Sequence, residues 1–261
     1  MAENVDTNRL PVLRPSDTPA AERRARVAQC GLTVMAKAPR PGSVKTRLSP
    51  PLSSHRAAAL NICFLRDTTE NLAGIAGAAG VISYTPVGDE ALFEGLLPDG
   101  FALLPQRGNG FGERLLAAAE DVLACGYGSV CLIDSDSPTV PRAAYEQAVE
   151  ELARPGDRIV LGPAADGGYY LIGLKQAYAT LFERIHWSTD TVAADTRERA
   201  REAGLELIEL PLWYDVDDGP TLDLLTAELA GSAPGFATVP GYPAPHTRDF
   251  LLVQPTIPRA E

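Results

Sequence analysis

Short apolar segments alternate along this chain with segments whose apolar residues recur at helical spacing. The short segments have the length and composition of buried strands, and most of them end at a polar or glycine-rich loop. We predict strands at residues 30–36, 80–84, 101–104, 129–133, 158–162, 169–174 and 205–210.

Helices are predicted between these strands. One helix begins after Ser53 or Ser54, either of which can cap it, and its apolar residues Ala57, Leu60 and Phe64 follow at helical spacing. Further helices are predicted at residues 111–122, 141–152, 191–203 and 221–229. This alternation implies an α/β fold, a mostly parallel central sheet with helices on both faces. Ligands bind such sheets at the carboxyl ends of the strands.

The 261 residues suit one α/β domain, which we place at residues 29–231. Residues 1–28 are polar and contain three prolines, so a flexible N-terminal extension or a short added helix near residues 20–28 is expected. Residues 232–261 carry six prolines and are expected to form an irregular tail on the surface.

The composition argues against several classes of protein. A net charge of −11 argues against a nucleic-acid-binding protein, whose surface is usually basic. No apolar stretch approaches the roughly 20 residues that cross a bilayer, and the N-terminus lacks the apolar region of a secretory signal. The four cysteines form no CxxC pair and lie in apolar segments, so we expect buried free thiols and a cytoplasmic protein. A homodimer is compatible with this composition.

Positive charge is concentrated in one part of this acidic chain. Residues 23–66 contain nine Lys or Arg residues and no Asp or Glu. This field indicates a small anionic ligand, and the alternative is a solvated basic face. Within it, the loop at residues 37–48 follows the first predicted strand. Gly42 allows a close backbone approach there, and Lys45 and Arg47 can bind phosphate oxygens, although the spacing is not that of a Walker A loop.

Two pairs of aspartates follow apolar segments at the same spacing. Asp134 and Asp136 come after the strand at residues 129–133, and Asp215 and Asp217 come after Trp213 and Tyr214. In an extended segment, side chains two residues apart point to the same side, so each pair could face one cation. Carboxylates select magnesium or manganese, often shared with phosphates of the substrate. The alternative for each pair is an exposed turn.

Two glycine-containing loops complete the set of candidate sites. Asp166, Gly167 and Gly168 follow a predicted strand, and Asp166 is either a ligand contact or a turn residue. The segment at residues 108–114 leads into a helix N-terminus, which could hold a phosphate or a base or could simply begin the helix. The segment at residues 186–189 could lie over the acceptor, but a lone histidine beside a tryptophan is more often structural, so we leave His186 out of the catalytic residues.

Together these motifs resemble a known bacterial group. The segments at residues 35–39, 44–48, 134–138, 166–170 and 215–218 are similar, in the same order, to the glycosyltransferase-like proteins named radical-SAM/selenodomain-associated transferases. That group belongs to the GT-A nucleotide-diphospho-sugar transferase superfamily. Within it the chain is also similar to phospholactate guanylyltransferase and, more distantly, to molybdenum-cofactor guanylyltransferase. It departs from these guanylyltransferases at residues 166–170, where they carry Thr-rich sequence.

The resemblance implies roles for individual residues. Lys45 and Arg47 would hold a triphosphate, and Asp136, Asp215 and Asp217 would bind magnesium, while Asp134 matches the first Asp of the glycosyltransferase DxD motif. The predicted catalytic residues are Lys45, Arg47, Asp136 and Asp217, with Asp134, Asp136, Asp215 and Asp217 as metal ligands. The predicted nucleotide-binding residues are Ala36, Lys37, Gly42, Lys45, Arg47, Gly108, Gly112, Glu113 and Asp134. The predicted acceptor-binding residues are Asp166, Gly167 and Gly168.

Three functions are compatible with these residues. The first is a metal-dependent nucleotidyltransferase that joins an NMP from a nucleoside triphosphate to a small phosphorylated or anionic acceptor and releases pyrophosphate. The basic loop favours it, because a triphosphate needs more local positive charge than a sugar diphosphate. The second is a GT-A glycosyltransferase that uses a nucleotide-diphospho-sugar, with Asp166 as a candidate base. The third, a non-catalytic nucleotide-binding protein, is disfavoured by the cost of two buried acidic pairs.

Overall fold

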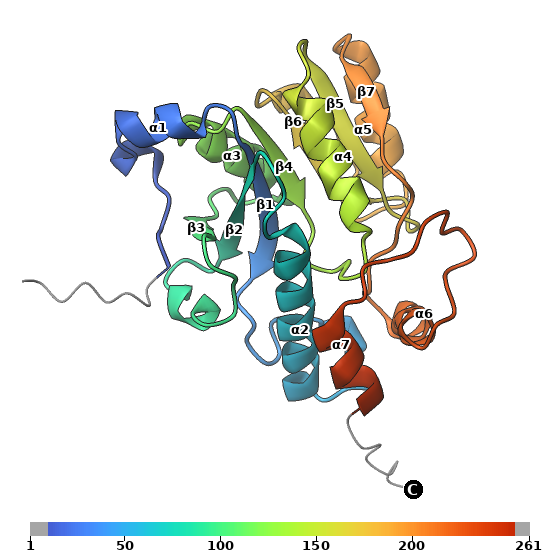
Figure 1. The fold of residues 1–261 in the computed structure, drawn as a ribbon. Coiled ribbons are helices and arrows are strands. Elements are labelled where there is room, and N and C mark those ends of the chain that lie inside the picture. Colours follow the sequence, from blue (N-terminus) through green and yellow to red (C-terminus); the bar gives the residue numbers. More distant parts are fainter. Residues whose placement is uncertain (1–9, 254–261) are drawn as a thin grey trace, which may run out of the picture.

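A seven-stranded sheet forms the centre of the computed structural model, which describes residues 10–253. The strand order is β3-β2-β1-β4-β6-β5-β7, and only β6 runs antiparallel to its neighbours (Figure 1). The strands are β1 (Cys30–Lys37), β2 (Ala78–Thr85), β3 (Ala102–Pro105), β4 (Ser129–Ile133), β5 (Arg158–Pro163), β6 (Tyr169–Leu174) and β7 (Glu206–Glu209). The predicted α/β class and mostly parallel sheet are confirmed.

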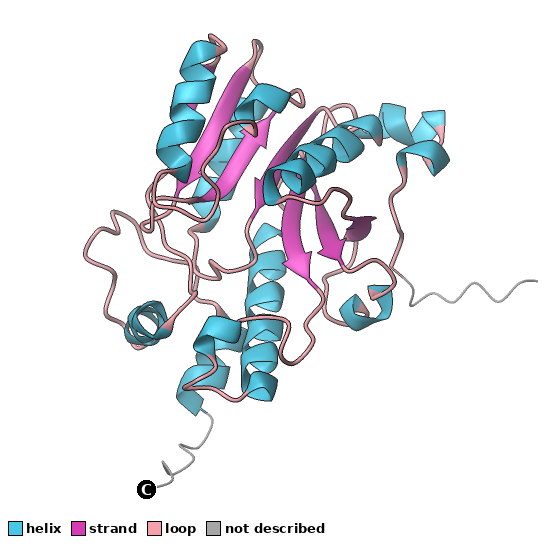
Figure 2. Cartoon of the chain, turned by 180° about the vertical axis from the view of Figure 1, so that it is seen from behind, coloured by secondary structure: helices cyan, strands magenta, loops and turns pink. Residues whose placement is uncertain are grey.

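Helices cover both faces of this sheet (Figures 1 and 2). Apolar residues of α2 (Ser54–Leu72), α4 (Arg142–Ala153) and α6 (Gly219–Leu229) share one core cluster with inward residues of the strands. A second cluster on the other face contains residues of α3 (Phe111–Ala124) and α5 (Val192–Glu202). Ser53 caps α2 as predicted, since its side chain accepts a hydrogen bond from the Arg56 backbone amide.

The short helical turns lie in the connections. Residues 20–26 form helix α1 (Ala20–Arg26), the alternative to a flexible extension at this place, and the Arg26 guanidinium donates to the carbonyl of Cys125 in the main domain. Residues 1–9 of the predicted flexible extension lie outside the described residues. The 3₁₀ turns are Pro15–Asp17, Thr46–Leu48, Glu90–Phe93 and Ala179–Leu181.

The proline-rich C-terminal segment is anchored to helix α2. Helix α7 (Pro245–Arg248) and the π-helical turn Asp249–Val253 continue the chain along this helix, so the prediction of an irregular tail is wrong over residues 245–253. Residues 232–244 are irregular as predicted, and residues 254–261 lie outside the described residues. The buried carboxylate of Asp67 accepts hydrogen bonds from the backbone amides of His246 at 3.0 Å and Thr247 at 2.7 Å. These bonds satisfy amides at the start of α7 that no helical carbonyl can reach.

We expect the substitution Asp67→Asn to lower the free energy of unfolding by about 2–3 kcal/mol, because an amide nitrogen would face a buried backbone N–H group. Urea unfolding measures this change. Glu70→Gln is the control, since Glu70 is exposed and its pairing with His246 should contribute less than about 1 kcal/mol. Equal stabilities of the two variants would show that Asp67 does not anchor the segment.

Candidate active site

The predicted site residues gather where the order of the strands reverses. Strand β1 pairs with β2 on one side and with β4 on the other, so the chain leaves β1 and β4 in opposite directions. Loops at the carboxyl ends of these two strands frame a crevice, which is the usual ligand site of an open α/β sheet. The loop with Lys45 follows β1, and Asp136 follows β4.

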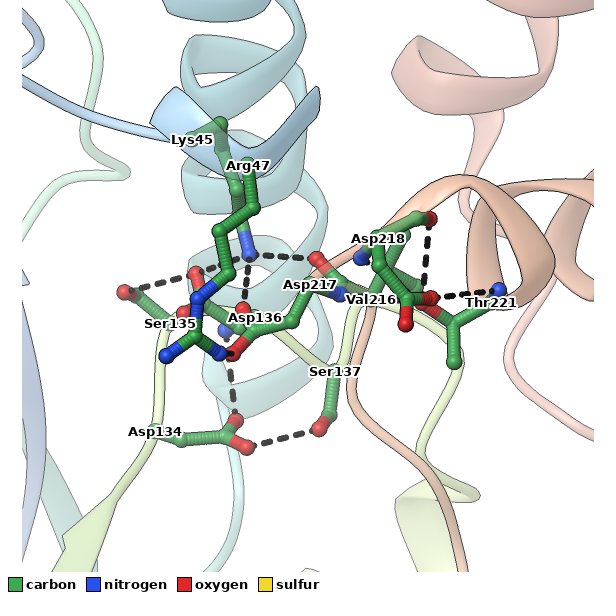
Figure 3. Close-up of polar contacts among 10 residues, drawn as sticks. All are labelled: Lys45, Arg47, Asp134, Ser135, Asp136, Ser137, Val216, Asp217, Asp218 and Thr221. Carbon is green, nitrogen blue, oxygen red and sulfur yellow. Dashed lines mark hydrogen bonds and ion pairs between the residues drawn. The ribbon is translucent and has the colours of Figure 1, made fainter. Parts of the chain in front are cut away.

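The ammonium group of Lys45 lies between the two acidic segments (Figure 3). Its Nζ is 2.8 Å from Asp136 Oδ1, 3.3 Å from Asp217 Oδ1 and 2.6 Å from the carbonyl oxygen of Val216. The side chain is only 3% exposed. Burial lowers the pKa of Lys45, but the charges of Asp136 and Asp217 outweigh it, and the pKa lies above its ordinary value.

Backbone contacts hold Asp136 and Asp217 near each other. The amide of Val216 donates to the Asp136 carbonyl at 3.0 Å, which ties the two segments together. The amide of Asp217 donates to the Thr221 hydroxyl at 3.0 Å, and Asp218 caps helix α6. The mostly exposed Arg47 reaches Asp217 Oδ2 at 3.5 Å. Two basic and two acidic side chains therefore converge from the loops after β1, β4 and β7.

The remaining aspartates of the two pairs have other partners. Asp134 accepts a hydrogen bond from the Ser137 hydroxyl at 2.7 Å, and Figure 3 shows it turned away from Lys45. Burial, followed by the charge of Asp136, raises the pKa of Asp134 well above its ordinary value. Burial also raises the pKa of Asp215 to about 6, with further contributions from the charges of Asp166 and Asp217. Both carboxyls are therefore held closer to their neutral form than an exposed aspartate.

Two cavities meet at this cluster. The first, of about 400 Å³, is bounded by the basic loop, and its polar lining includes Asn61, Gln106 and Arg114. Of the predicted residues, it is lined by Ala36, Lys37, Lys45, Arg47, Asp136 and Asp217. Its basic side chains suit the phosphates of a nucleotide.

The second cavity, of about 600 Å³, is mainly acidic and aromatic. Of the predicted residues, it is lined by Lys37, Arg47, Asp134, Asp136, Asp166, Gly168, Asp215 and Asp217. Phe111 and Trp187 pack edge to face with ring centroids 5.2 Å apart, and Phe111 borders both cavities. The two cavities share Lys37, Arg47, Asp136 and Asp217, so ligands in them would meet at these side chains.

Five predicted residues line neither cavity and instead shape the loops around them. The carboxylate of Glu113 accepts hydrogen bonds from the backbone amides of Asn109 and Gly110 at the start of α3, and Gly108 packs against Glu113. A Cβ atom at Gly112 would lie 2.7 Å from the Trp187 indole nitrogen, so glycine lets the indole pack on the helix. Gly42 and Gly167 have positive φ angles of 80° and 92°.

Gly167 fixes the loop between β5 and β6 against the loop before α5. A Cβ atom there would lie 2.0 Å from the carbonyl oxygen of Asp190, in addition to the strain of its positive φ. We expect Gly167→Ala to lower the free energy of unfolding by more than about 2 kcal/mol. Gly204→Ala is the control, because Gly204 also has a positive φ but has no atom within 4 Å of the added Cβ. Similar losses in urea unfolding of both variants would exclude the contact with Asp190 as the cause.

Several lining residues were not identified from the sequence. Gln106 and Thr85 stand at the ends of β3 and β2, where the rule for carboxyl ends of strands could have found them. Trp187, Ser188 and Thr189 line the second cavity, in the segment that the sequence suggested could lie over the acceptor. The neighbouring Asp190 was not identified, and no local pattern marks it. His186, interpreted as structural, forms a 2.8 Å pair with Asp195 and lies outside both linings.

The four aspartates predicted as metal ligands do not bring three carboxylate oxygens within 4.8 Å of one another. Among residues 10–253, one group of three His, Cys, Asp or Glu side chains brings ligand atoms within 4.8 Å of one another: Asp67, Glu70 and His246. The anchoring of the C-terminal segment explains that group. Asp136 and Asp217 converge instead on the Lys45 ammonium, so a cation already lies between carboxylates of the kind that magnesium and manganese prefer.

The described part of the chain contains no helix long and apolar enough to span a membrane. All four cysteines are free, as expected, and three of them are buried, whereas Cys63 is half-buried.

Comparisons with known proteins agree with this architecture. Residues 68–189 match the family described as "Uncharacterized protein conserved in bacteria (DUF2064)". No curated protein matches the chain. The crystal structure named "putative nucleotide-diphospho-sugar transferase from Desulfovibrio desulfuricans G20" is 32% identical, with a TM-score of 0.72, over 85% of this chain and 96% of that one. The CTP complex of CMP:2-keto-3-deoxy-manno-octonic acid synthetase is 12% identical, with a TM-score of 0.52, over 78% of this chain and 100% of that one, and shows the shared fold.

Proposed function

Because this chain belongs to the DUF2064 family and is a relative of the Desulfovibrio protein named for nucleotide-diphospho-sugar transfer, we propose that it is a transferase acting on a nucleotide. More specifically, we propose a metal-dependent nucleotidyltransferase. The observation that carries this proposal is the wall shared by the two cavities, where Arg47, Asp136 and Asp217 border both. A donor in the first cavity and an acceptor in the second would react across that wall.

The basic loop suits a triphosphate donor. Lys37, Lys45, Arg47 and Arg114 all line the first cavity, and together they can neutralise the phosphates and stabilise charge that develops on leaving pyrophosphate. An oxygen of the acceptor would attack the α-phosphorus. The new O–P bond forms while the bond from the α-phosphorus to the bridging oxygen breaks, and pyrophosphate leaves with that electron pair. Such a transfer depends on position and charge rather than on a protein nucleophile.

Asp136, Asp217 and Asp215 would hold magnesium or manganese, with Asp134 nearby. When bound, the metal supplies positive charge that polarises the phosphate oxygens and orients donor and acceptor. The acceptor would lie in the second cavity beside Asp166 and Gly168, with an anionic reacting group near Lys37 and Arg47.

Glycosyl transfer from a nucleotide-diphospho-sugar is the second candidate. Two observations favour it: the name of the Desulfovibrio relative and the position of Asp166, an exposed carboxylate on the wall of the second cavity. Asp166 Oδ1 accepts a hydrogen bond from the Gly168 amide, which would orient the carboxylate as a base towards an acceptor hydroxyl.

Product analysis separates the two candidates. The protein is incubated with magnesium, each nucleoside triphosphate and a panel of small phosphorylated acids, and pyrophosphate is measured. Nucleotidyl transfer predicts pyrophosphate with at least one pair of substrates. Cleavage of UDP- or GDP-sugars without pyrophosphate under any condition would reject it in favour of glycosyl transfer. Thermal shift with each nucleotide, with and without magnesium, identifies the donor first, because a ligand of the folded state raises the melting temperature.

A further inference from the structure

We infer that the Lys45 ammonium occupies the position of the metal ion until a nucleotide binds, so that metal and nucleotide enter this site together. The inference rests on the proposed metal-dependent function, and it concerns how that site is filled. It starts from the contacts of Lys45, which are those of a bound cation rather than of a side chain waiting for phosphate.

All the donors of this ammonium are already used. A lysine ammonium has three N–H groups, and Nζ has three acceptors within 3.3 Å, namely Asp136 Oδ1, Asp217 Oδ1 and the Val216 carbonyl oxygen. The centroid of the Phe64 ring lies 5.3 Å from Nζ. With a side chain only 3% exposed, Lys45 cannot bind a phosphate oxygen without giving up one of these acceptors.

The same carboxylate oxygens cannot serve the ammonium and a metal ion at once. A magnesium ion bound between Asp136 and Asp217 would take the oxygens that Nζ now contacts, and it would repel a positive group held at hydrogen-bond distance from them. Arg47 does not close the site in this way, because its side chain is 74% exposed and reaches Asp217 only at 3.5 Å.

A nucleotide can release Lys45 without leaving any charge unpaired. Lys45 lines the first cavity, so phosphates bound there would offer its ammonium new acceptors within reach of the same side chain. The metal ion would then replace the ammonium between the two aspartates. Each carboxylate keeps a cation throughout, and the exchange couples metal binding to the presence of phosphates. Without nucleotide, metal affinity is reduced by the fraction of molecules in which Lys45 fills the site.

The test measures the affinity of the full chain for Mn²⁺ in the absence of nucleotide, with electron paramagnetic resonance as the readout of free and bound Mn²⁺. We expect Lys45→Met to bind Mn²⁺ at least about tenfold more tightly than the wild type. Arg47→Met is the matched control, because it also removes one positive charge from the cluster but vacates no position between the aspartates. Its affinity should change less than about threefold.

Circular dichroism and a melting curve establish that each variant is folded. If Lys45→Met does not fold, Lys45→Gln, which retains a donor for the Val216 carbonyl, takes its place with the same expected gain. Equal or weaker Mn²⁺ binding by the Lys45 variant, or an equal gain in Arg47→Met, would overturn the inference while leaving the proposed function standing. Absence of Mn²⁺ binding in every protein at millimolar concentrations, with and without nucleotide, would overturn the metal site and both proposals. A gain at Lys45 in a protein that forms no pyrophosphate would support the inference and reject nucleotidyl transfer.

Discussion

Replacing Asp217 with asparagine is expected to abolish magnesium-dependent nucleotide binding, with a loss of affinity of at least about 100-fold. Asp217 borders both cavities, and its carboxylate is the side chain on which Lys45 and Arg47 both converge. An asparagine keeps the shape but carries no charge, so it cannot offset a magnesium ion. The basic side chains would also lose a shared anion, and Lys45 would retain Asp136 as its only carboxylate.

Isothermal titration with a nucleoside triphosphate, in the presence and absence of magnesium, measures this loss. Asp218→Asn is the matched control, since it makes the same change one residue away, at a position that lines neither cavity. Asp218 caps helix α6, and asparagine is an equally good N-cap, so binding and stability should stay close to wild type. Full retention of magnesium-dependent binding by Asp217→Asn would remove this residue from the site.

The sequence predicted which loops meet but not how their side chains pair. Lys45, Asp136 and Asp217 each follow an apolar segment, and this position predicts that they lie close together, because the carboxyl ends of parallel strands share one edge of the sheet. The expectation that Asp134 and Asp136 face one cation assumed an extended backbone. Residues 134–137 turn instead, and Asp134 bonds the Ser137 hydroxyl and the Asp136 amide. A short turn gives an aspartate local donors, and this local bonding decided its direction.

The direction of β6 could have been predicted from the sequence, whereas part of the wall of the second cavity could not. Five residues separate β5 from β6, too few for a parallel crossover, so their antiparallel pairing could have been predicted from the spacing. The packing of Trp187 on helix α3 could not be predicted, because it depends on a close approach to Gly112, which lies 75 residues earlier in the chain. Similarly, the prolines after residue 232 suggested irregular structure, whereas Asp67, far away in the sequence, anchors residues 246 and 247.

The charged carboxylate of Asp215, which we propose as a metal ligand, is expected to lower the free energy of unfolding. Burial, and then the charges of Asp166 and Asp217, raise its pKa to about 6. The folded protein therefore binds this proton more tightly than the unfolded chain, whose aspartate has a pKa of about 4. Between pH of about 4 and 6, the native state loses stability as pH rises, and above pH 6 the full cost is present. We expect Asp215→Asn to raise the free energy of unfolding by about 1–2 kcal/mol at neutral pH, with no gain near pH 4.

The same substitution should weaken magnesium-dependent nucleotide binding by about 10-fold to 100-fold, so stability and binding would change in opposite directions. Urea unfolding at several pH values, with titration of nucleotide and magnesium at neutral pH, measures both. Asp190→Asn is the control, because Asp190 lines the same cavity but is exposed, and its loss should leave stability unchanged. A loss of stability in Asp215→Asn at neutral pH would contradict the raised pKa, since it would mean that the folded protein favours the charged carboxylate. A gain in stability with unchanged binding would instead show that Asp215 is strained for a reason other than holding the metal.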